Sequence, residues 1–390
     1  MKTSNAVSLV TIHVSLFTIL LAPSAFAQGN LAPPGAPAPT MKTLAQVEPR
    51  TPINQASLPF TINASGSYYV TENLSVASGN AITINASGVT LDLTGFTITS
   101  SSATAAGSAV LINSGLHDIS ILNGHIVGGV TYNGTSFSTG PGFQTGITYT
   151  GTNPGNVRVS GVSVAGCSLT GIELGFEYSN VVDHCTVRWV GGQGIHAGAV
   201  SDATAYQCGS NGINAITASG CYGTTTASAR GVYSDTAVNC VGVSVSGVGL
   251  DSITASSCYG SSNDGTGLNA TSAESSFGMS GGGFGILATN AHGCYGLSSS
   301  AQGIRATAVS DCYGQSDVNV GVLATNAATN CYGKSDSSYG LSTGGTAIGC
   351  YGFSTSGTGL NASVAIGCGG SGSPAVFATH KYLSGIGPDS

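Results

Sequence analysis

The chain has few charged residues, and this scarcity excludes several classes of protein. Its 390 residues include 9 Lys and Arg and 16 Asp and Glu, or 6% charged, where soluble domains average about 25%. Helical bundles and coiled coils need charged solvent-facing positions, and nucleic-acid-binding domains need a basic surface. We therefore expect neither a helical protein nor a nucleic-acid partner. The 41% of apolar residues recur with a fixed period, which argues against a disordered polymer.

The N-terminus has the pattern of a secretory signal sequence. Lys2 precedes an apolar run over residues 7–22, and Ala25-Phe26-Ala27 supplies the small residues of a cleavage site. We predict a signal peptide over residues 1–27, followed by a Pro-rich linker over residues 28–47. No later stretch reaches about eighteen consecutive apolar residues. We therefore expect an exported protein, outside the cell or at its surface, without a membrane span.

Glycine is abundant, and the 60 Gly residues mark an internal repeat. A Gly followed by a β-branched residue or Leu recurs in steps of 18 or 19 residues. The copies are Gly194-Ile195, Gly212-Ile213, Gly231-Val232, Gly249-Leu250, Gly267-Leu268, Gly285-Ile286, Gly303-Ile304, Gly321-Val322, Gly340-Leu341 and Gly359-Leu360. Helical repeats need about 33 residues or more, so this period indicates that each repeat is one coil of β-structure.

Other positions keep the same phase within each repeat. Two residues after the aliphatic residue comes Ala or Ser, as at Ala215, Ser234, Ser252 and Ala270, and three residues later comes Ala again, as at Ala218, Ala237, Ala255 and Ala273. A Cys column follows at Cys221, Cys240, Cys258, Cys294, Cys312, Cys331, Cys350 and Cys368, with Ser276 in the place of the missing member. Ser or Thr stands four residues after each Cys, except the last.

These columns predict an all-β fold, a single-stranded parallel β-helix or β-solenoid with three sides per coil. The repeating side chains would face the axis, and stacking coils about 4.8 Å apart would bury them. Upstream, alternating residues at 82–84 and 89–98 reappear 28 to 30 residues later at 110–112 and 119–126. We therefore expect wide N-terminal coils of about 28 residues that taper to C-terminal coils of 18 or 19, about thirteen coils in all.

The predicted organisation has three parts after the linker. An N-terminal cap and the wide coils occupy residues 48–150, regular β-helix repeats occupy residues 151–370, and a C-terminal cap or tail occupies residues 371–390.

Several segments carry a resemblance to a known family. They are residues 52–62, 66–70, 82–85, 89–98 and 119–124, together with the later Cys-Tyr-Gly coils. This pattern resembles secreted bacterial right-handed parallel β-helix proteins of the pectate-lyase-like superfamily, over roughly residues 48–370. The resemblance implies a right-handed helix but little about activity, because the superfamily contains lyases, hydrolases, binding modules and structural rods. For a lyase it would imply carboxylates that hold calcium, so we expect Ca²⁺ only in that case and otherwise no cofactor.

The cysteines allow three interpretations. The repeat spacing stacks the eight column Cys, which favours a buried, reduced ladder of small packing residues. Disulfides between coils are the second, although parallel in-register side chains would strain them. Metal binding is the third, and we do not expect a metal site because no His accompanies the Cys. Cys208 is out of phase with the column and is predicted to be an exposed thiol.

Aromatic residues follow the Cys in most coils and form a predicted outward row. Its members are Tyr222, Tyr259, Phe277, Tyr295, Tyr313, Tyr332 and Tyr351, interrupted by Val241. The row has two interpretations: stacked rings that stiffen a rod, or a ligand-binding platform for the sugar rings of an extended polysaccharide.

The densest polar cluster supplies the candidate catalytic residues. It contains Glu173, Glu177, Asp183, His184, Arg188 and His196. Aligning the repeats stacks Glu173, His196 and Asn214 on one outward row, which continues through Tyr233, Asp251 and Asn269. Carboxylates beside His or Arg suit general acid–base chemistry. A solvated polar patch is the alternative interpretation.

Three functions from different classes follow. We expect first an exported rod with a structural or glycan-binding role, with polysaccharide or a cell-surface glycan as partner. The alternative is a polysaccharide lyase or glycoside hydrolase acting on an extended polysaccharide. The third is an assembly rod that self-associates through open coil ends, where strand edges are exposed.

Overall fold

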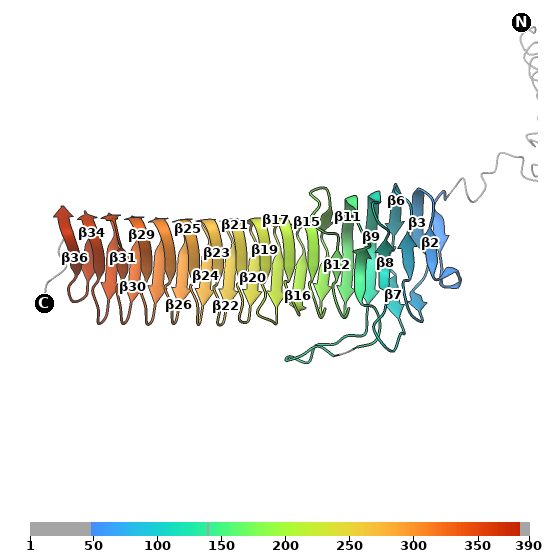
Figure 1. Cartoon of the computed structure of the whole chain (residues 1–390), viewed down its shortest axis with the longest axis horizontal. Helices are drawn as coiled ribbons and strands as arrows, with labels where there is room; N and C mark the ends of the chain where they lie inside the picture. The colour runs from blue at the N-terminus through green and yellow to red at the C-terminus, as the bar shows by residue number, and fades with distance from the viewer. Residues whose placement is uncertain (1–47, 139, 383–390) are drawn as a thin grey trace, which may run out of the picture. The chain divides into compact units, whose positions relative to one another are not determined.

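The computed structural model describes residues 48–138 and 140–382. The predicted signal peptide and linker, and residues 383–390 of the predicted C-terminal cap, lie outside the described residues. Residues 50–382 form a stack of coils in which each strand pairs in parallel with the strands of the coils before and after it (Figure 1). The predicted parallel β-solenoid is therefore confirmed. Within the described ranges, no helix is long and apolar enough to cross a membrane.

The strands form three columns, which we call faces A, B and C. Face A contains β2 (Phe60–Ile62), β5 (Ile82–Ile84), β8 (Ser108–Ile112), β10 (Thr145–Tyr149), β12 (Ile172–Glu173), β31 (Leu341–Thr343) and the first halves of β15 (Ile195–Ser201), β17 (Ile213–Ser219), β19 (Val232–Val238), β21 (Leu250–Ser256), β23 (Leu268–Glu274), β25 (Ile286–His292), β27 (Ile304–Ser310), β29 (Val322–Thr329), β34 (Leu360–Ile366) and β36 (Val376–Tyr382). Face B contains β1 (Thr51–Ile53), β3 (Gly66–Val70), β6 (Val89–Asp92), the first halves of β9 (His117–Val127) and β11 (Gly155–Ala165), β13 (Val181–Asp183), β32 (Thr346–Ile348) and the second halves of the long face A strands.

Face C completes each coil with a short strand. It contains β4 (Leu74–Val76), β7 (Thr97–Ser100), the ends of β9 and β11, β14 (Thr186–Arg188), β16 (Thr204–Cys208), β18 (Tyr222–Thr225), β20 (Val241–Ser244), β22 (Tyr259–Ser262), β24 (Phe277–Ser280), β26 (Tyr295–Ser298), β28 (Tyr313–Ser316), β30 (Tyr332–Ser335), β33 (Tyr351–Ser354) and β35 (Gly369–Ser371). A 3₁₀ turn at Gln55–Ser57 lies between β1 and β2.

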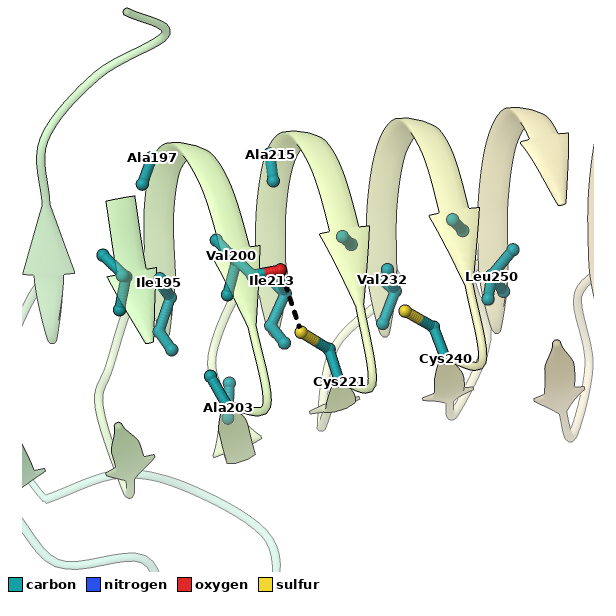
Figure 2. Close-up of a cluster of buried hydrophobic side chains, with 14 of the residues drawn as sticks. Ile195, Ala197, Val200, Ala203, Ile213, Ala215, Cys221, Val232, Cys240 and Leu250 are labelled. Atoms are coloured by element: carbon teal, nitrogen blue, oxygen red, sulfur yellow. Dashed lines mark hydrogen bonds between the residues drawn. The ribbon is translucent and has the colours of Figure 1, made fainter. Parts of the chain in front are cut away.

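The register between coils matches the predicted repeat. Ile195 pairs with Ile213, Ile213 with Val232, and Val232 with Leu250, and Figure 2 shows these side chains in sequence along the stack. In the described part of the chain, face B carries seventeen stacked strands from β1 to β36, more than the thirteen coils expected. The difference arises because the first and last coils lack the repeat motif that sequence counting follows.

The longest coil owes its length to a loop. Ile119 pairs with Val157, an offset of 38 residues, whereas Val182 pairs with Val200, an offset of 18. The chain between β9 and β10 accounts for much of the difference and projects from the stack (Figure 1).

The core changes in character along the stack. In the first coils, large aliphatic side chains such as Ile82, Leu91 and Ile98 are fully buried. In the regular coils, one aliphatic residue per coil is joined by Ala, Cys and Ser columns. The predicted inward columns are therefore confirmed, and Ser276 occupies the buried position of the missing Cys.

Glycine closes each regular coil at a place where two backbones meet. A Cβ on Gly267 would lie 2.5 Å from the backbone N of Met279, and one on Gly278 would lie 2.1 Å from the carbonyl oxygen of Gly285. Neither space admits a side chain, which explains the two glycine columns of the repeat.

All eleven cysteines are free and buried. The prediction that Cys208 is exposed is wrong: its side chain is fully buried, and burial raises the pKa of its thiol. The register on face C shifts between Ala205 and Cys208, so that Cys208 pairs with Thr225. That shift turns Cys208 into the inward column that Ser and Thr occupy in later coils.

Candidate ligand-binding groove

The predicted polar row lies on face A in the predicted order. Glu173 pairs with His196 and His196 with Asn214, and the row continues through Tyr233, Asp251 and Asn269. Alternation along each strand places these residues on the side opposite the buried aliphatic column.

A groove of about 480 Å³ follows the downstream half of this row, from β19 to β25. It spans four consecutive coils. Its polar lining residues include Arg230, Tyr233, Asp235, Asp251, Asn269 and Thr271.

Side chains from three consecutive coils hold one another in the groove. The Arg230 Nε donates a hydrogen bond to Asp251 Oδ2 at 2.5 Å, and the guanidinium lies 4.6 Å from the centroid of the Tyr233 ring. Asn269 Nδ2 donates to Asp251 Oδ1 at 2.7 Å. Because both carboxylate oxygens and the ring are engaged, the planar groups have fixed orientations before any ligand arrives.

Two residues at the groove carry hydroxyls that are buried on the core side of face A and have no hydrogen-bond partner. The residues Ser234 and Ser252 are 1% and 7% exposed, and neither Oγ is bonded within the protein. A buried unpartnered polar atom costs about 1–3 kcal/mol, so such atoms are rare in stable folds. In the described residues, the other unpartnered buried side-chain atoms are His196 Nε2 and Asn214 Oδ1, which belong to the same row. These unsatisfied atoms therefore concentrate on four successive coils of face A.

At the upstream end of the row, Glu173 and His196 form a close pair. Glu173 Oε1 lies 2.5 Å from His196 Nδ1, and the ring of Phe176 packs against the imidazole, edge to face, at 4.3 Å. Burial and the charge of Glu173 raise the pKa of Tyr149 nearby. The other ring nitrogen of His196 is buried, so in this arrangement it has no access to a ligand.

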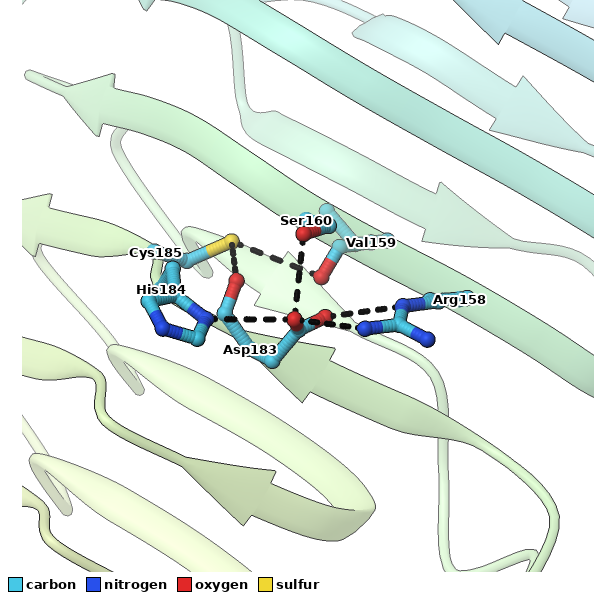
Figure 3. Close-up of polar contacts among 6 residues, drawn as sticks. All are labelled: Arg158, Val159, Ser160, Asp183, His184 and Cys185. Atoms are coloured by element: carbon cyan, nitrogen blue, oxygen red, sulfur yellow. Dashed lines mark hydrogen bonds and ion pairs between the residues drawn. The ribbon is translucent and has the colours of Figure 1, made fainter.

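Asp183 and His184 belong to a separate cluster. Asp183 is buried and accepts hydrogen bonds from Arg158 Nη2 at 2.8 Å and from Ser160 Oγ at 3.1 Å, while His184 Nδ1 lies 3.2 Å away (Figure 3). Burial raises the pKa of Asp183, but the hydrogen bonds from Arg158, His184 and Ser160 outweigh it and lower the pKa overall. With both oxygens occupied, this carboxylate joins two coils instead of facing a ligand.

The sequence did not single out Arg158, the main partner of Asp183. The 23-residue register places Ser160 directly beside Asp183, and Arg158 two residues earlier on the same strand. Aligning the coils by that offset could have found it. His184 also has a backbone role, since its φ of 52° places it in the left-handed region at a corner.

The remaining candidate catalytic residues join neither cluster. The Arg188 guanidinium lies 4.5 Å from the centroid of the Trp189 ring, and Glu177 is exposed. The structure therefore divides the predicted catalytic residues among separate places. The described residues also contain no group of three or more His, Cys, Asp or Glu able to hold a metal ion.

On face C, six aromatic rings from Tyr259 to Tyr351 form a continuous stack, which we call the aromatic ladder. Their centroids lie 4.6 to 5.5 Å apart and neighbouring planes are within 12° of parallel. Tyr222 stands apart because Val241 separates it from Tyr259. Each interior ring has a neighbour on both faces, so a ligand can reach only ring edges and the two end faces.

No protein-family model matches the chain, and no curated protein matches its sequence. The structure is similar to the A-module of mannuronan C-5 epimerase AlgE6 from Azotobacter vinelandii, with 12% identity and a TM-score of 0.32 over 84% of this chain and 92% of that one. It is also similar to a GH136 lacto-N-biosidase from Eubacterium ramulus, with 10% identity and a TM-score of 0.29 over 86% of this chain and 61% of that one. Likeness at these TM-scores carries no argument about activity, so function is argued from the chain's own residues.

Proposed function

We propose that this chain is an exported, right-handed parallel β-helix of the pectate-lyase-like kind that binds an extended polysaccharide along face A without cleaving it. The right hand is the one that nearly all parallel β-crossovers adopt. The groove on four consecutive coils, with polar side chains held in fixed orientations, is the observation that carries the proposal.

The chemistry of the groove suits a sugar chain. Each sugar unit offers hydroxyls that both donate and accept hydrogen bonds, and the side chains of Asp235, Asp251 and Thr271 offer complementary groups. Coils stacked about 4.8 Å apart repeat these groups at a spacing close to the length of one sugar unit in an extended chain. A polysaccharide lying parallel to the stack would therefore meet similar polar groups on successive coils.

The second candidate function is a polysaccharide lyase or glycoside hydrolase, favoured by the Glu173–His196 pair. A carboxylate that orients an imidazole is a common general-base arrangement. Burial of the second imidazole nitrogen and the wide separation of the other candidate residues favour the binding function over this one.

A single assay separates the two functions. Purified protein is incubated with a panel of insoluble and soluble polysaccharides, and both retention of the protein and release of sugar products are measured. We expect retention without products. Tyr233→Ala is expected to weaken retention about tenfold or more, since it removes the ring that positions Arg230.

Tyr313→Ala is the matched control, because it removes an equal ring from the aromatic ladder. If the control weakens retention as much as Tyr233→Ala, the groove is not the binding site. If products accumulate and Glu173→Gln or His196→Ala abolishes them, the chain is an enzyme instead.

A further inference from the structure

The charges that line the groove are unbalanced toward the negative. Arg230 is the one cation of the lining, and Asp235 and Asp251 are its two anions. Asp251 already pairs with Arg230, and Asp235 is exposed at the rim with no ion pair among the described residues. The next cation along the row, Arg305, lies one coil beyond the groove with its guanidinium over the ring of Phe284.

This imbalance disfavours an acidic polysaccharide. A polyuronate carries a carboxylate on every sugar unit, and in the groove these would face Asp235 and Asp251. Like charges repel more strongly beside a protein surface than in bulk water, and the guanidinium of Arg230 is already committed. An acidic chain would therefore bind with an electrostatic penalty.

The exposed groups of the lining fit an uncharged chain better. The carboxylate of Asp235 accepts hydrogen bonds and the hydroxyl of Thr271 both donates and accepts, so they can pair with the alcohol groups of a neutral sugar. Strong binding of a carboxylate calls instead for cationic or backbone N–H donors.

We propose that the groove selects an uncharged polysaccharide and rejects polyuronates. This inference rests on the proposed binding function and names the class of its ligand. Isothermal titration calorimetry tests it with hexasaccharides of equal length. The neutral set contains gluco-, xylo-, manno- and galacto-hexasaccharides, and the acidic set contains galacturonate and mannuronate hexasaccharides.

We expect the best neutral ligand to bind at least about tenfold more tightly than either uronate, with an affinity independent of salt between about 0.01 and 0.5 M. Asp235→Lys reverses the charge at the rim. It is expected to strengthen uronate binding at least about tenfold at low salt. The matched control is Asp317→Lys, which makes the same charge change at an exposed position outside the groove and should leave uronate binding unchanged.

The outcomes distinguish the inference from the function on which it rests. Uronate binding as tight as neutral binding would overturn the inference while the binding function stands. A similar gain in uronate binding for Asp235→Lys and Asp317→Lys would overturn it too, because general charge would then explain the effect. No binding of any hexasaccharide would overturn both.

Discussion

The aromatic ladder on face C and the groove on face A are built from the same repeat, yet they differ in how far their groups are satisfied. In the ladder, each interior ring is covered on both faces by its neighbours. Beneath the groove, buried hydroxyls on neighbouring coils lack any partner. The ladder therefore offers a ligand only ring edges and its two end faces, whereas the groove offers exposed polar side chains such as Asp235 and Thr271.

The serines of the two faces show the same contrast at the level of single atoms. On face C, Ser298 Oγ donates to the carbonyl of Gly283 at 2.7 Å and accepts from the backbone N–H of Ala301 at 2.9 Å. On face A, Ser252 is equally buried but has no hydrogen bond. The first serine stabilises the stack, whereas the second costs stability.

The largest expected effect is on the aromatic ladder. Tyr313→Ala removes two stacked pairs, each worth about 0.5–1.5 kcal/mol, and should lower the free energy of unfolding by about 1–3 kcal/mol. Tyr233→Ala removes one contact with Arg230 at a partly exposed site and should cost less than about 1 kcal/mol. Urea unfolding followed by circular dichroism measures both. Equal losses would show that the ladder adds no special stability.

Paired serine variants give the next largest effect. Ser298→Ala removes the hydroxyl that joins the partly buried carbonyl of Gly283 to the N–H of Ala301 and should cost about 1–2 kcal/mol. Ser252→Ala removes an atom that has no partner, so it should leave the unfolding midpoint unchanged or raise it. A clear loss of stability for Ser252→Ala would mean that its hydroxyl is bonded after all.

The smallest effect extends the comparison to the Asp183 cluster upstream. The pKa of Asp183 is lower in the folded protein than in the unfolded chain. The ionised carboxylate therefore stabilises the fold fully at pH values above its unfolded-state pKa of about 4, and this stabilisation is lost as the pH falls through its folded-state pKa. The Asp183→Asn variant should therefore have a lower melting temperature than the parent protein near pH 7. This difference in melting temperature should shrink below about pH 4. Thermal melts across this range measure the difference, and Asp317→Asn serves as the exposed control. A difference that does not depend on pH would contradict the assigned role of the carboxylate.

The sequence predicted the fold well because strict periodicity fixes which residues stack. The columns of Ile195 and Ile213, and the order of the polar row from Glu173 to Asn269, follow directly from the period. Cys208 was missed because a local register shift on one strand is invisible to a period count. The polar row along which the groove runs was predicted, but the unpartnered atoms beside it were not, for a different reason.

A repeat pattern says which side chains stack but not which atoms find partners. Ser234 and Ser252 replace Ala in a small-residue column, and that substitution was the signal available. Whether such a hydroxyl is satisfied depends on the carbonyl and N–H groups around it, which only coordinates supply. The stacking of ring faces in the aromatic ladder likewise depends on side-chain rotamers and not on spacing.

Because each strand of the regular coils pairs only with the coils directly before and after it, nothing in the fold sets how many coils there are. An in-frame duplication of one 18-residue unit, such as residues 268–285, would insert a further coil and leave every existing register intact. The length of the stack can thus change in steps of about 4.8 Å, one coil at a time, without any change in the sequence of either terminal coil.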